Sequence, residues 1–167
     1  MGLSEQLAGV IPDGEIRDFS SRFDVTGDIA IVTLSPALQK YDQIIAETII
    51  KHRHGIRTVA KKSARVTGDF RTARYDSITG NGTVTTHREY GFSSHLDLNT
   101  SFFNPRLAQE QRRVTGQVRA GESVLVPFCG VGSFVIPAAA RDASVVAIEQ
   151  NPDACRFLQR EHQEKPG

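Results

Sequence analysis

Cysteine is scarce in this chain, which has only Cys129 and Cys155 among its 167 residues. Two cysteines supply neither a disulfide framework nor a set of metal ligands, so a disulfide-stapled secreted domain and a zinc module are excluded. The five histidines also lack the spacing of metal ligands. We therefore expect no metal site and a reducing intracellular compartment.

Long apolar runs and an excess of charge of one sign are absent as well. No stretch approaches the roughly 20 apolar residues that span a membrane, and the start, MGLSEQLAGVIPDG, lacks the basic end and apolar core of a secretory signal. The chain has 20 basic and 19 acidic residues, so affinity for nucleic acid must come from local clustering. These absences predict a cytoplasmic protein without a membrane partner.

The first hundred residues read as a loosely held segment, residues 1–20, followed by a small α+β domain, residues 21–100. Residues 28–34 form a short β-branched run typical of a buried strand. Ser35 and Pro36 then begin a helix, with the serine as N-cap. Gly80-Asn81-Gly82 is expected at the tip of a hairpin with arms at residues 70–78 and 83–92.

A strand-turn-helix-strand unit follows in the last third of the chain. Val124–Val126 predicts a strand that is apolar on both faces, as in a parallel sheet covered by helices. Gly130 and Gly132 allow a tight turn that comes close to a ligand. The second strand ends at Glu149, roughly 20 residues after the glycines, where a carboxylate can accept the hydroxyl hydrogen bonds of a ribose.

The number of glycines in this unit favours one cofactor. A third glycine at the dinucleotide spacing is missing, which favours S-adenosylmethionine over NAD. Because a G-x-G turn also occurs in ordinary strand-to-helix connections, a purely structural unit is the alternative.

Five segments, in this order, resemble the archaeal and eukaryotic-type tRNA (guanine-37-N1)-methyltransferases and their wybutosine-synthesis aminocarboxypropyltransferase relatives. The segments are GDIAIVTL, HREYGF, LDLNTSFFNPRLAQEQRRV, FCGVGSF and AIEQNPDA. The resemblance extends over about residues 23–158. It implies an α/β protein with a small α+β domain, residues 21–100. A linker helix and the first βαβα portion of a class I, Rossmann-like, S-adenosylmethionine-dependent methyltransferase domain follow, residues 101–167.

The resemblance also implies roles for individual residues. Glu110 matches the general base, whose pKa is expected to rise when the carboxylate is desolvated against the target base. Arg71 matches the arginine that stabilises charge on guanine O6, and Arg106 helps fix the closed geometry. Arg74 lies three residues after Arg71, so on one strand the two would face opposite sides. The implied cofactor-binding residues are Phe128, Gly130, Val131, Gly132, Glu149, Gln150 and Asn151.

Without the resemblance, Glu110 reads as an ordinary solvated helix carboxylate. A basic stretch without an acid runs from Lys51 to Arg65, and such local clustering is the footprint of phosphate contacts. A solvated helix end and strand edge is the alternative. The residues expected to contact tRNA are Lys61, Lys62, Arg65 and Asn104.

The chain departs from the family pattern in three places. Val126 stands where the first strand usually has an aspartate, and Gln111 replaces a commonly basic residue beside Glu110. After Glu149 only one further helix is expected, so the later strands and the N-(L/P)-P segment of the family are missing. An uncovered sheet edge would then pair with another copy or another chain.

Three functions are consistent with these observations. The first is methyl transfer from S-adenosylmethionine to N1 of guanine 37 of tRNA, which the NPRL segment favours. The second is transfer of an aminocarboxypropyl group from the same cofactor. The third is a non-catalytic module, left by truncation, that binds tRNA or a partner.

Overall fold

The computed structural model describes residues 3–17, 19–20, 22–68 and 70–163. The chain divides into two compact units. Unit 1 comprises Met1–Arg65 and Ala73–Thr83, and unit 2 comprises Val66–Thr72 and Val84–Gly167. The division at residues 83 and 84 differs from the boundary expected near residue 100, because the strands after residue 83 pack with the last helix of the chain.

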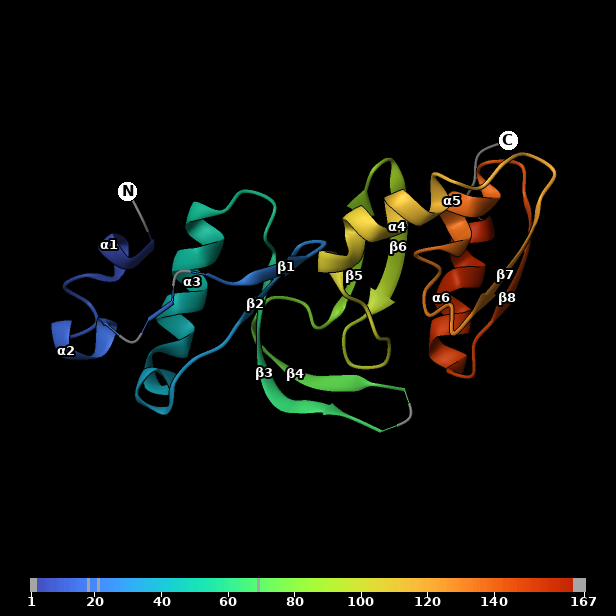
Figure 1. Ribbon diagram of the computed structural model, residues 1–167. Coiled ribbons are helices and arrows are strands. Elements are labelled where there is room, and N and C mark those ends of the chain that lie inside the picture. Colours follow the sequence, from blue (N-terminus) through green and yellow to red (C-terminus); the bar gives the residue numbers. More distant parts are fainter. Residues whose placement is uncertain (1–2, 18, 21, 69, 164–167) are drawn as a thin grey trace. The chain divides into compact units, whose positions relative to one another are not determined.

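Unit 1 is built from a four-stranded sheet and three helices (Figure 1). Its helices are α1 (Leu3–Leu7), α2 (Asp13–Ile16) and α3 (Asp42–His52), the last preceded by a 3-10 helix at Pro36–Tyr41. Its strands are β1 (Asp24–Thr26), β2 (Ile29–Val32), β3 (Thr58–Thr67) and β4 (Thr72–Thr79), in the order β1-β2-β3-β4. β1 is antiparallel to β2, and β2 is parallel to β3.

The core of unit 1 includes the segment that we expected to be loosely held. Leu7 and Ile11 are fully buried and join the same apolar cluster as Ile45 and Ile49 of α3. The expectation of a loose start is therefore wrong for the described residues 3–17: apolar side chains spaced four apart give this segment a buried side.

The hairpin expected around Gly80-Asn81-Gly82 is wrong, because β4 pairs with β3 and not with the strand that follows. A hairpin instead joins β5 (Val84–Glu89) and β6 (Phe92–Asp97). Its turn is Tyr90-Gly91, where both residues have positive φ (48° and 85°) as a type I′ turn requires.

Unit 2 contains that hairpin and a βαβα segment. A 3-10 helix at Pro105–Leu107 leads into α4 (Ala108–Thr115), and β7 (Ser123–Pro127), α5 (Val135–Ala139), β8 (Ser144–Ile148) and α6 (Pro152–Gln163) follow. β7 and β8 are parallel and in register from Ser123 opposite Ser144 to Pro127 opposite Ile148. α6 packs on β6, and α5 on β8.

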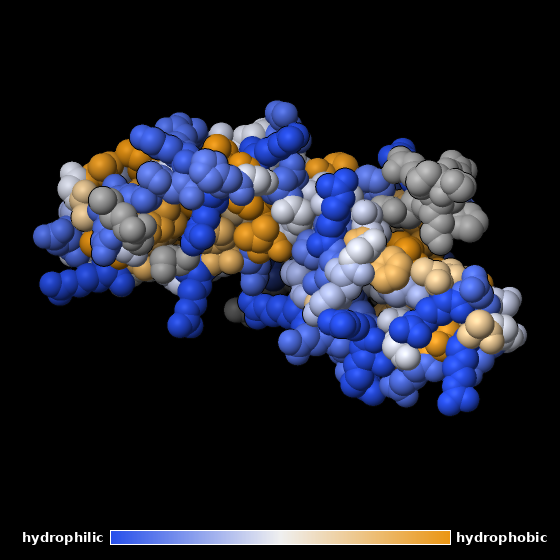
Figure 2. Space-filling model, turned by 90° about the horizontal axis from the view of Figure 1, so that it is seen from above, coloured by the Kyte–Doolittle hydropathy of each residue, from blue (hydrophilic) through white to orange (hydrophobic). Residues whose placement is uncertain are grey.

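One face of the β7–β8 sheet is exposed in the described structure. Val124 and Val126 are half-buried, whereas Leu125 is 62% exposed, Val146 59% and Ile148 54%. The expectation that helices cover both faces of the Val124–Val126 strand is therefore wrong. Figure 2 shows that apolar side chains, in orange, also reach the surface among polar ones elsewhere on the molecule.

Among the described residues, none of the helices has the length and apolar character needed to cross a bilayer. The same residues contain no group of histidine, cysteine, aspartate or glutamate side chains that could hold a metal ion.

Gly80 is required by a close approach of two backbones. Its φ is +97°, and a Cβ atom there would overlap the carbonyl oxygen of Arg57 and the side chain of Thr58. Gly82 has a similar φ of +88°, but a Cβ atom there would meet no neighbour within 4 Å.

We predict that Gly80→Ala destabilises unit 1 by at least about 2 kcal/mol more than Gly82→Ala. Both substitutions carry the strain of positive φ, about 1–3 kcal/mol, and only Gly80→Ala adds the overlap. Hydrogen exchange of the amides of β3 under native conditions measures the difference. Equal losses of protection in the two variants would contradict the close approach.

Candidate functional site

A cavity of about 440 Å³ lies in unit 2, where β7 and β8 end. The carboxyl ends of parallel strands are where open α/β sheets bind ligands. We call this cavity the cofactor cavity. It is lined by Phe70, Arg71, Phe102, Phe128, Gly130, Glu149, Gln150, Asn151 and Ala154. The structure thus brings together most of the residues predicted to bind a cofactor, together with Arg71.

Two of the predicted cofactor residues lie elsewhere. Val131 is buried in the turn between β7 and α5, and Gly132 lines a different cavity. The turn itself has a left-handed backbone at Phe128 (φ 57°), Gly130 (φ 56°) and Gly132 (φ 94°). Phe128 is also 85% exposed, so the turn presents an aromatic ring at the cavity.

The carboxylate of Glu149 joins the two turns that border the cavity. The backbone N–H of Gly130 donates to Oε2 at 2.7 Å, and the backbone N–H of Asn151 donates to Oε1 at 2.8 Å. A carboxylate has about four lone-pair positions. Glu149 can therefore hold both turns and still accept hydrogen bonds from a ligand.

Asn151 is an N-cap as well as a cavity residue. It is only 4% exposed, and its Oδ1 accepts hydrogen bonds from the backbone N–H groups of Asp153 (3.0 Å) and Ala154 (3.5 Å) at the start of α6. Its Nδ2 donates to the carbonyl of Thr100 at 2.7 Å. The side chain thus fixes α6 to the segment that follows β6.

Arg71 lies in the turn before β4, with φ 52°, and only Arg74 is on the strand. The expectation that the two arginines alternate on one strand is therefore wrong. The guanidinium of Arg71 lies over the ring of Phe102, 5.4 Å from its centroid, a cation–π contact within unit 2. Sequence reasoning missed Phe70 and Phe102 as cavity residues, although Phe102 belongs to the segment LDLNTSFFNPRLAQEQRRV that carries part of the family resemblance.

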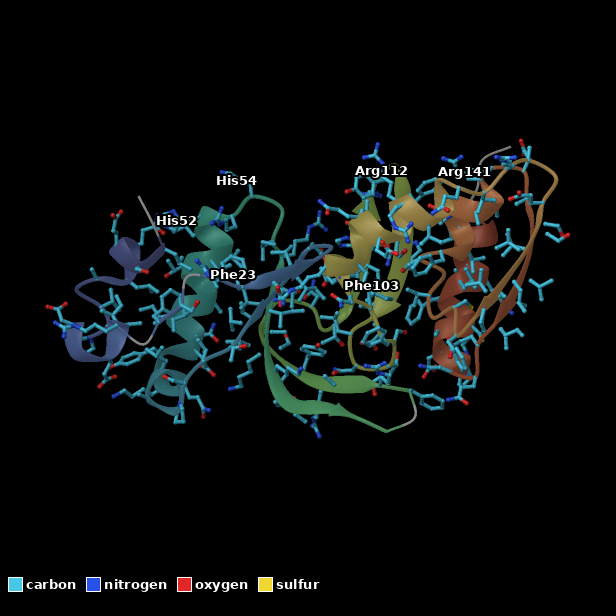
Figure 3. All side chains as sticks on the ribbon, viewed as in Figure 1. Phe23, His52, His54, Phe103, Arg112 and Arg141 are labelled. Atoms are coloured by element: carbon cyan, nitrogen blue, oxygen red, sulfur yellow. The ribbon has the colours of Figure 1, made fainter. Side chains whose placement is uncertain are left out.

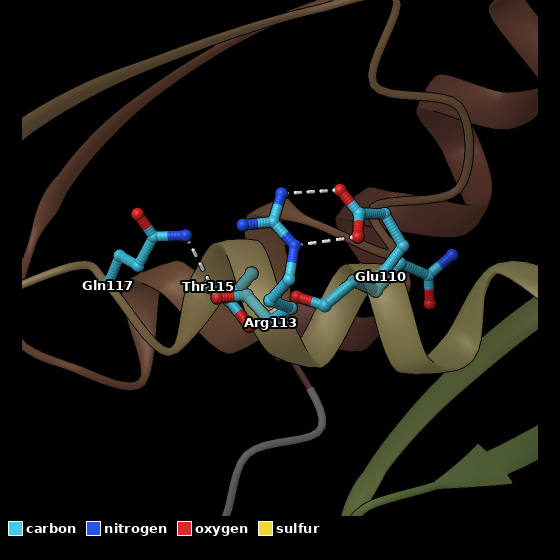
Figure 4. A network of polar contacts seen from close by, with 5 residues as sticks. Glu110, Arg113, Thr115 and Gln117 are labelled. Carbon is cyan, nitrogen blue, oxygen red and sulfur yellow. Dashed lines mark hydrogen bonds and ion pairs between the residues drawn. The ribbon is translucent and has the colours of Figure 1, made fainter.

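Glu110 does not line the cofactor cavity but forms a two-point ion pair on α4 (Figure 4). Nε of Arg113 donates to Oε2 at 2.8 Å and Nη2 to Oε1 at 2.6 Å. The hydrogen bonds from Arg113 hold the pKa of the Glu110 carboxyl below its ordinary value. In this arrangement the carboxylate is half exposed and faces a cation. The rise of its pKa on desolvation against the target base stays a prediction.

Asn104 and Arg106 lie at the start of the helix that carries Glu110. The side chain of Asn104 accepts a hydrogen bond from the backbone N–H of Arg106 at 3.1 Å, which makes Asn104 the N-cap of the 3-10 helix. The predicted roles of both residues with substrate stay predictions.

The basic stretch of unit 1, residues 51–65, contains no acidic residue, but an aspartate from another part of the sequence lies beside it in the structure. Lys61 forms an ion pair of 2.8 Å with Asp42 of α3, whereas Lys62 is exposed. Arg65 lies on β3, and its side chain is outside the described part of the structure. An open groove of about 430 Å³ lies in the same unit, lined by Arg22, Phe23, Val25, Arg53, His54 and Ile56. Phe23 and His54 are labelled in Figure 3.

Two family models match the chain. The TYW2 N-terminal domain matches residues 3–83, and the TRM5/TYW2 methyltransferase domain matches residues 85–163. The junction between the two matches coincides with the division between the two units.

Several known proteins are similar to the chain over most of its length. The tRNA (guanine(37)-N(1))-methyltransferase Trm5b of Pyrococcus abyssi is 36% identical over 147 residues, 87% of this chain and 44% of that protein. The structure of aTrm5 in complex with tRNALeu has a TM-score of 0.81 at 29% identity and covers 96% of this chain and 47% of the other. TYW2 of P. horikoshii in complex with MeSAdo has a TM-score of 0.78 at 29% identity and covers 96% and 57%. This chain thus spans less than half the length of the curated relative.

We predict that Arg113→Ala raises the pKa of the Glu110 carboxyl toward its ordinary value. The ion pair favours the charged carboxylate, so the pair is fully formed above the ordinary pKa and is lost as pH falls through the lowered pKa. NMR titration of the Glu110 side-chain carboxyl carbon measures this pKa directly. The matched control is Arg156→Ala, which breaks an i,i+3 pair with Asp153 on α6. An unchanged Glu110 pKa in Arg113→Ala would contradict the pairing.

Proposed function

Because the chain belongs to the TRM5/TYW2 methyltransferase family, we propose that it binds S-adenosylmethionine and acts in the methylation of N1 of guanine 37 in tRNA. The observation that carries this proposal is the cofactor cavity, in which the glycine turn after β7 and the acid after β8 meet. Adenosine-containing cofactors bind to such paired turns.

The cavity fits S-adenosylmethionine in its chemistry. Phe70, Phe102 and Phe128 supply aromatic surface for an adenine ring, and Glu149 supplies an acceptor for ribose hydroxyls. The similarity to a relative solved with MeSAdo supports the same class of ligand. When bound, S-adenosylmethionine supplies an electrophilic methyl group.

Residues of this chain would activate the guanine that receives the methyl group. We assign the N1 proton of guanine to the carboxylate of Glu110, since N1 must lose its proton as it gains the methyl group. The electron pair of the broken N–H bond is shared between N1 and O6 until N1 uses it to bond the methyl group, and the guanidinium of Arg71 at the cavity wall would stabilise the charge that develops on O6. Arg106 would help hold the closed arrangement.

Glu110 must leave Arg113 to act in this way. A two-point pair with a guanidinium occupies both carboxylate oxygens and weakens the base. In the proposed mechanism, Glu110 exchanges its partner for the base when tRNA is bound.

Contacts with tRNA phosphates are proposed for the basic stretch of unit 1. Lys62 is exposed, and Arg53 lies beside the ring of Phe23, with its guanidinium carbon 5.9 Å from the centroid. Lys61 is the weaker candidate because Asp42 already compensates its charge. The similarity to a structure that contains tRNALeu supports tRNA as the partner.

Aminocarboxypropyl transfer is the second candidate. The match of residues 3–83 to the TYW2 N-terminal domain and the similarity to TYW2 of P. horikoshii favour it. The two reactions differ in the group that leaves the sulfur of the cofactor. Product analysis by mass spectrometry distinguishes them on one tRNA.

Cofactor binding is tested by calorimetric titration of the chain with S-adenosylmethionine. We expect Glu149→Ala to weaken binding at least about tenfold, because the ligand loses a hydrogen-bond acceptor and the two turns lose the hydrogen bonds that connect them. Glu122→Ala is the matched control: Glu122 also accepts a backbone N–H, from Arg119 at 2.9 Å, and it does not line the cavity. Equal affinity of Glu149→Ala and the parent chain would show that the cofactor site lies elsewhere.

The role of Glu110 is tested by single-turnover methylation of tRNA. The assay uses a chimera that adds the part of P. abyssi Trm5b that this chain does not match. Glu110→Gln keeps the shape of the side chain but accepts no proton, so we expect the rate to fall by about 100-fold or more. Glu122→Gln is expected to react at the parent rate. If Glu110→Gln does the same, Glu110 is an ordinary helix residue.

A further inference from the structure

A second cavity of unit 2 has its own set of side chains. Its volume of about 380 Å³ is at the lower end of the roughly 300–1,000 Å³ range of ligand sites. It lies among the β5–β6 hairpin, α4 and α5, and is here called the hairpin cavity. None of its lining residues lines the cofactor cavity.

Aromatic rings form much of the wall of the hairpin cavity. They come from His87, Tyr90, Phe92 and Phe103. The rings of His87 and Phe103 have centroids 5.0 Å apart and planes at 56°. Tyr90, at the hairpin turn, is half exposed. Proteins hold unstacked nucleobases on aromatic faces of this kind.

Two exposed arginines complete the cavity, and both are labelled in Figure 3. The guanidinium carbon of Arg112 lies 4.9 Å from the centroid of the Tyr90 ring. Arg141 donates one hydrogen bond, at 3.3 Å, to the carbonyl of Val118. A guanidinium has five N–H donors, so both side chains retain donors for the oxygens of a phosphate.

A carboxylate and several neutral polar groups line the same space. Glu89 is half-buried and accepts hydrogen bonds only, which favours a base that presents N–H donors. Guanine presents two kinds of donor, its ring N1–H and its exocyclic amino group, on one edge. The aromatic walls match the faces of a guanine base, the carboxylate matches its N–H edge, and the two guanidinium groups match a phosphate.

We propose that the hairpin cavity binds a guanine nucleotide, with the base among the aromatic rings and the phosphate on Arg112 and Arg141. This site is separate from the cofactor cavity and does not depend on the methyl-transfer proposal. The same chemistry is offered by a free mononucleotide and by a nucleotide unit of RNA.

The test measures fluorescence anisotropy of two probes on the full chain. One probe is GMP with a methylanthraniloyl group on its ribose, and the other is a short fluorescein-labelled single-stranded RNA that contains guanine. We expect Arg112→Ala and Arg141→Ala each to weaken binding by about tenfold, the usual effect of losing a charge-assisted hydrogen bond. Arg156→Ala is the matched control, since Arg156 is an exposed arginine of the same unit outside the cavity.

Saturating adenosine, added to occupy the cofactor cavity, is expected to displace neither probe. Weakening of both probes by the two arginine variants assigns the site to a free nucleotide, and weakening of the RNA probe alone assigns it to a nucleotide unit of RNA. Either result supports the proposal. Displacement by adenosine overturns it, as does equal binding by the parent chain and both arginine variants.

Amide NMR spectra establish that each variant is folded, and Arg112→Gln and Arg141→Gln replace any alanine variant that is not.

Discussion

The two hydrogen bonds accepted by Glu149 hold the candidate site of this chain together. One carboxylate oxygen takes the N–H of Gly130 after β7, and the other takes the N–H of Asn151 after β8. Asn151 in turn caps α6 and reaches the carbonyl of Thr100. The side chains of Glu149 and Asn151 together thus link both turns, the last helix and the segment after β6, and these elements border the cofactor cavity.

The glycine turn also separates two cavities of different character. Gly130 lies on the side of the cofactor cavity, and Gly132 on the side of the hairpin cavity. The φ of Gly132 is +94°, which strains any other residue, and a Cβ atom there would force the end of the Leu158 side chain of α6 to move. The sequence pattern G-V-G therefore serves packing between elements as much as the approach of a ligand.

Local patterns predicted the βαβ unit, whereas contacts distant in sequence escaped them. Glu149 follows the second apolar strand, and a single helical connection separates that strand from the glycine turn. The position of Glu149 next to the glycine turn could therefore be predicted from the sequence. Gly80 was wrongly predicted to lie at the tip of a hairpin, because glycine favours the positive φ of such turns. In the structure, a glycine is needed at this position because the backbone of Arg57 leaves no space for a Cβ atom. The contact of Arg71 with Phe102 joins residues 31 positions apart, which no period of a helix or strand reveals. The pair of Glu110 and Arg113 is local, and i,i+3 spacing of opposite charges could have predicted it.

The central claim, that the turns joined by Glu149 form a cofactor site, is tested most directly by amide NMR. S-Adenosylmethionine is titrated into the isotope-labelled chain, and the backbone amides of both turns and of the hairpin cavity are followed. The account predicts progressive, saturable shifts at Gly130, Gln150 and Asn151, with little change at Tyr90 of the β5–β6 turn. Saturable shifts confined to the hairpin cavity, or no shifts at any of these amides, would contradict it.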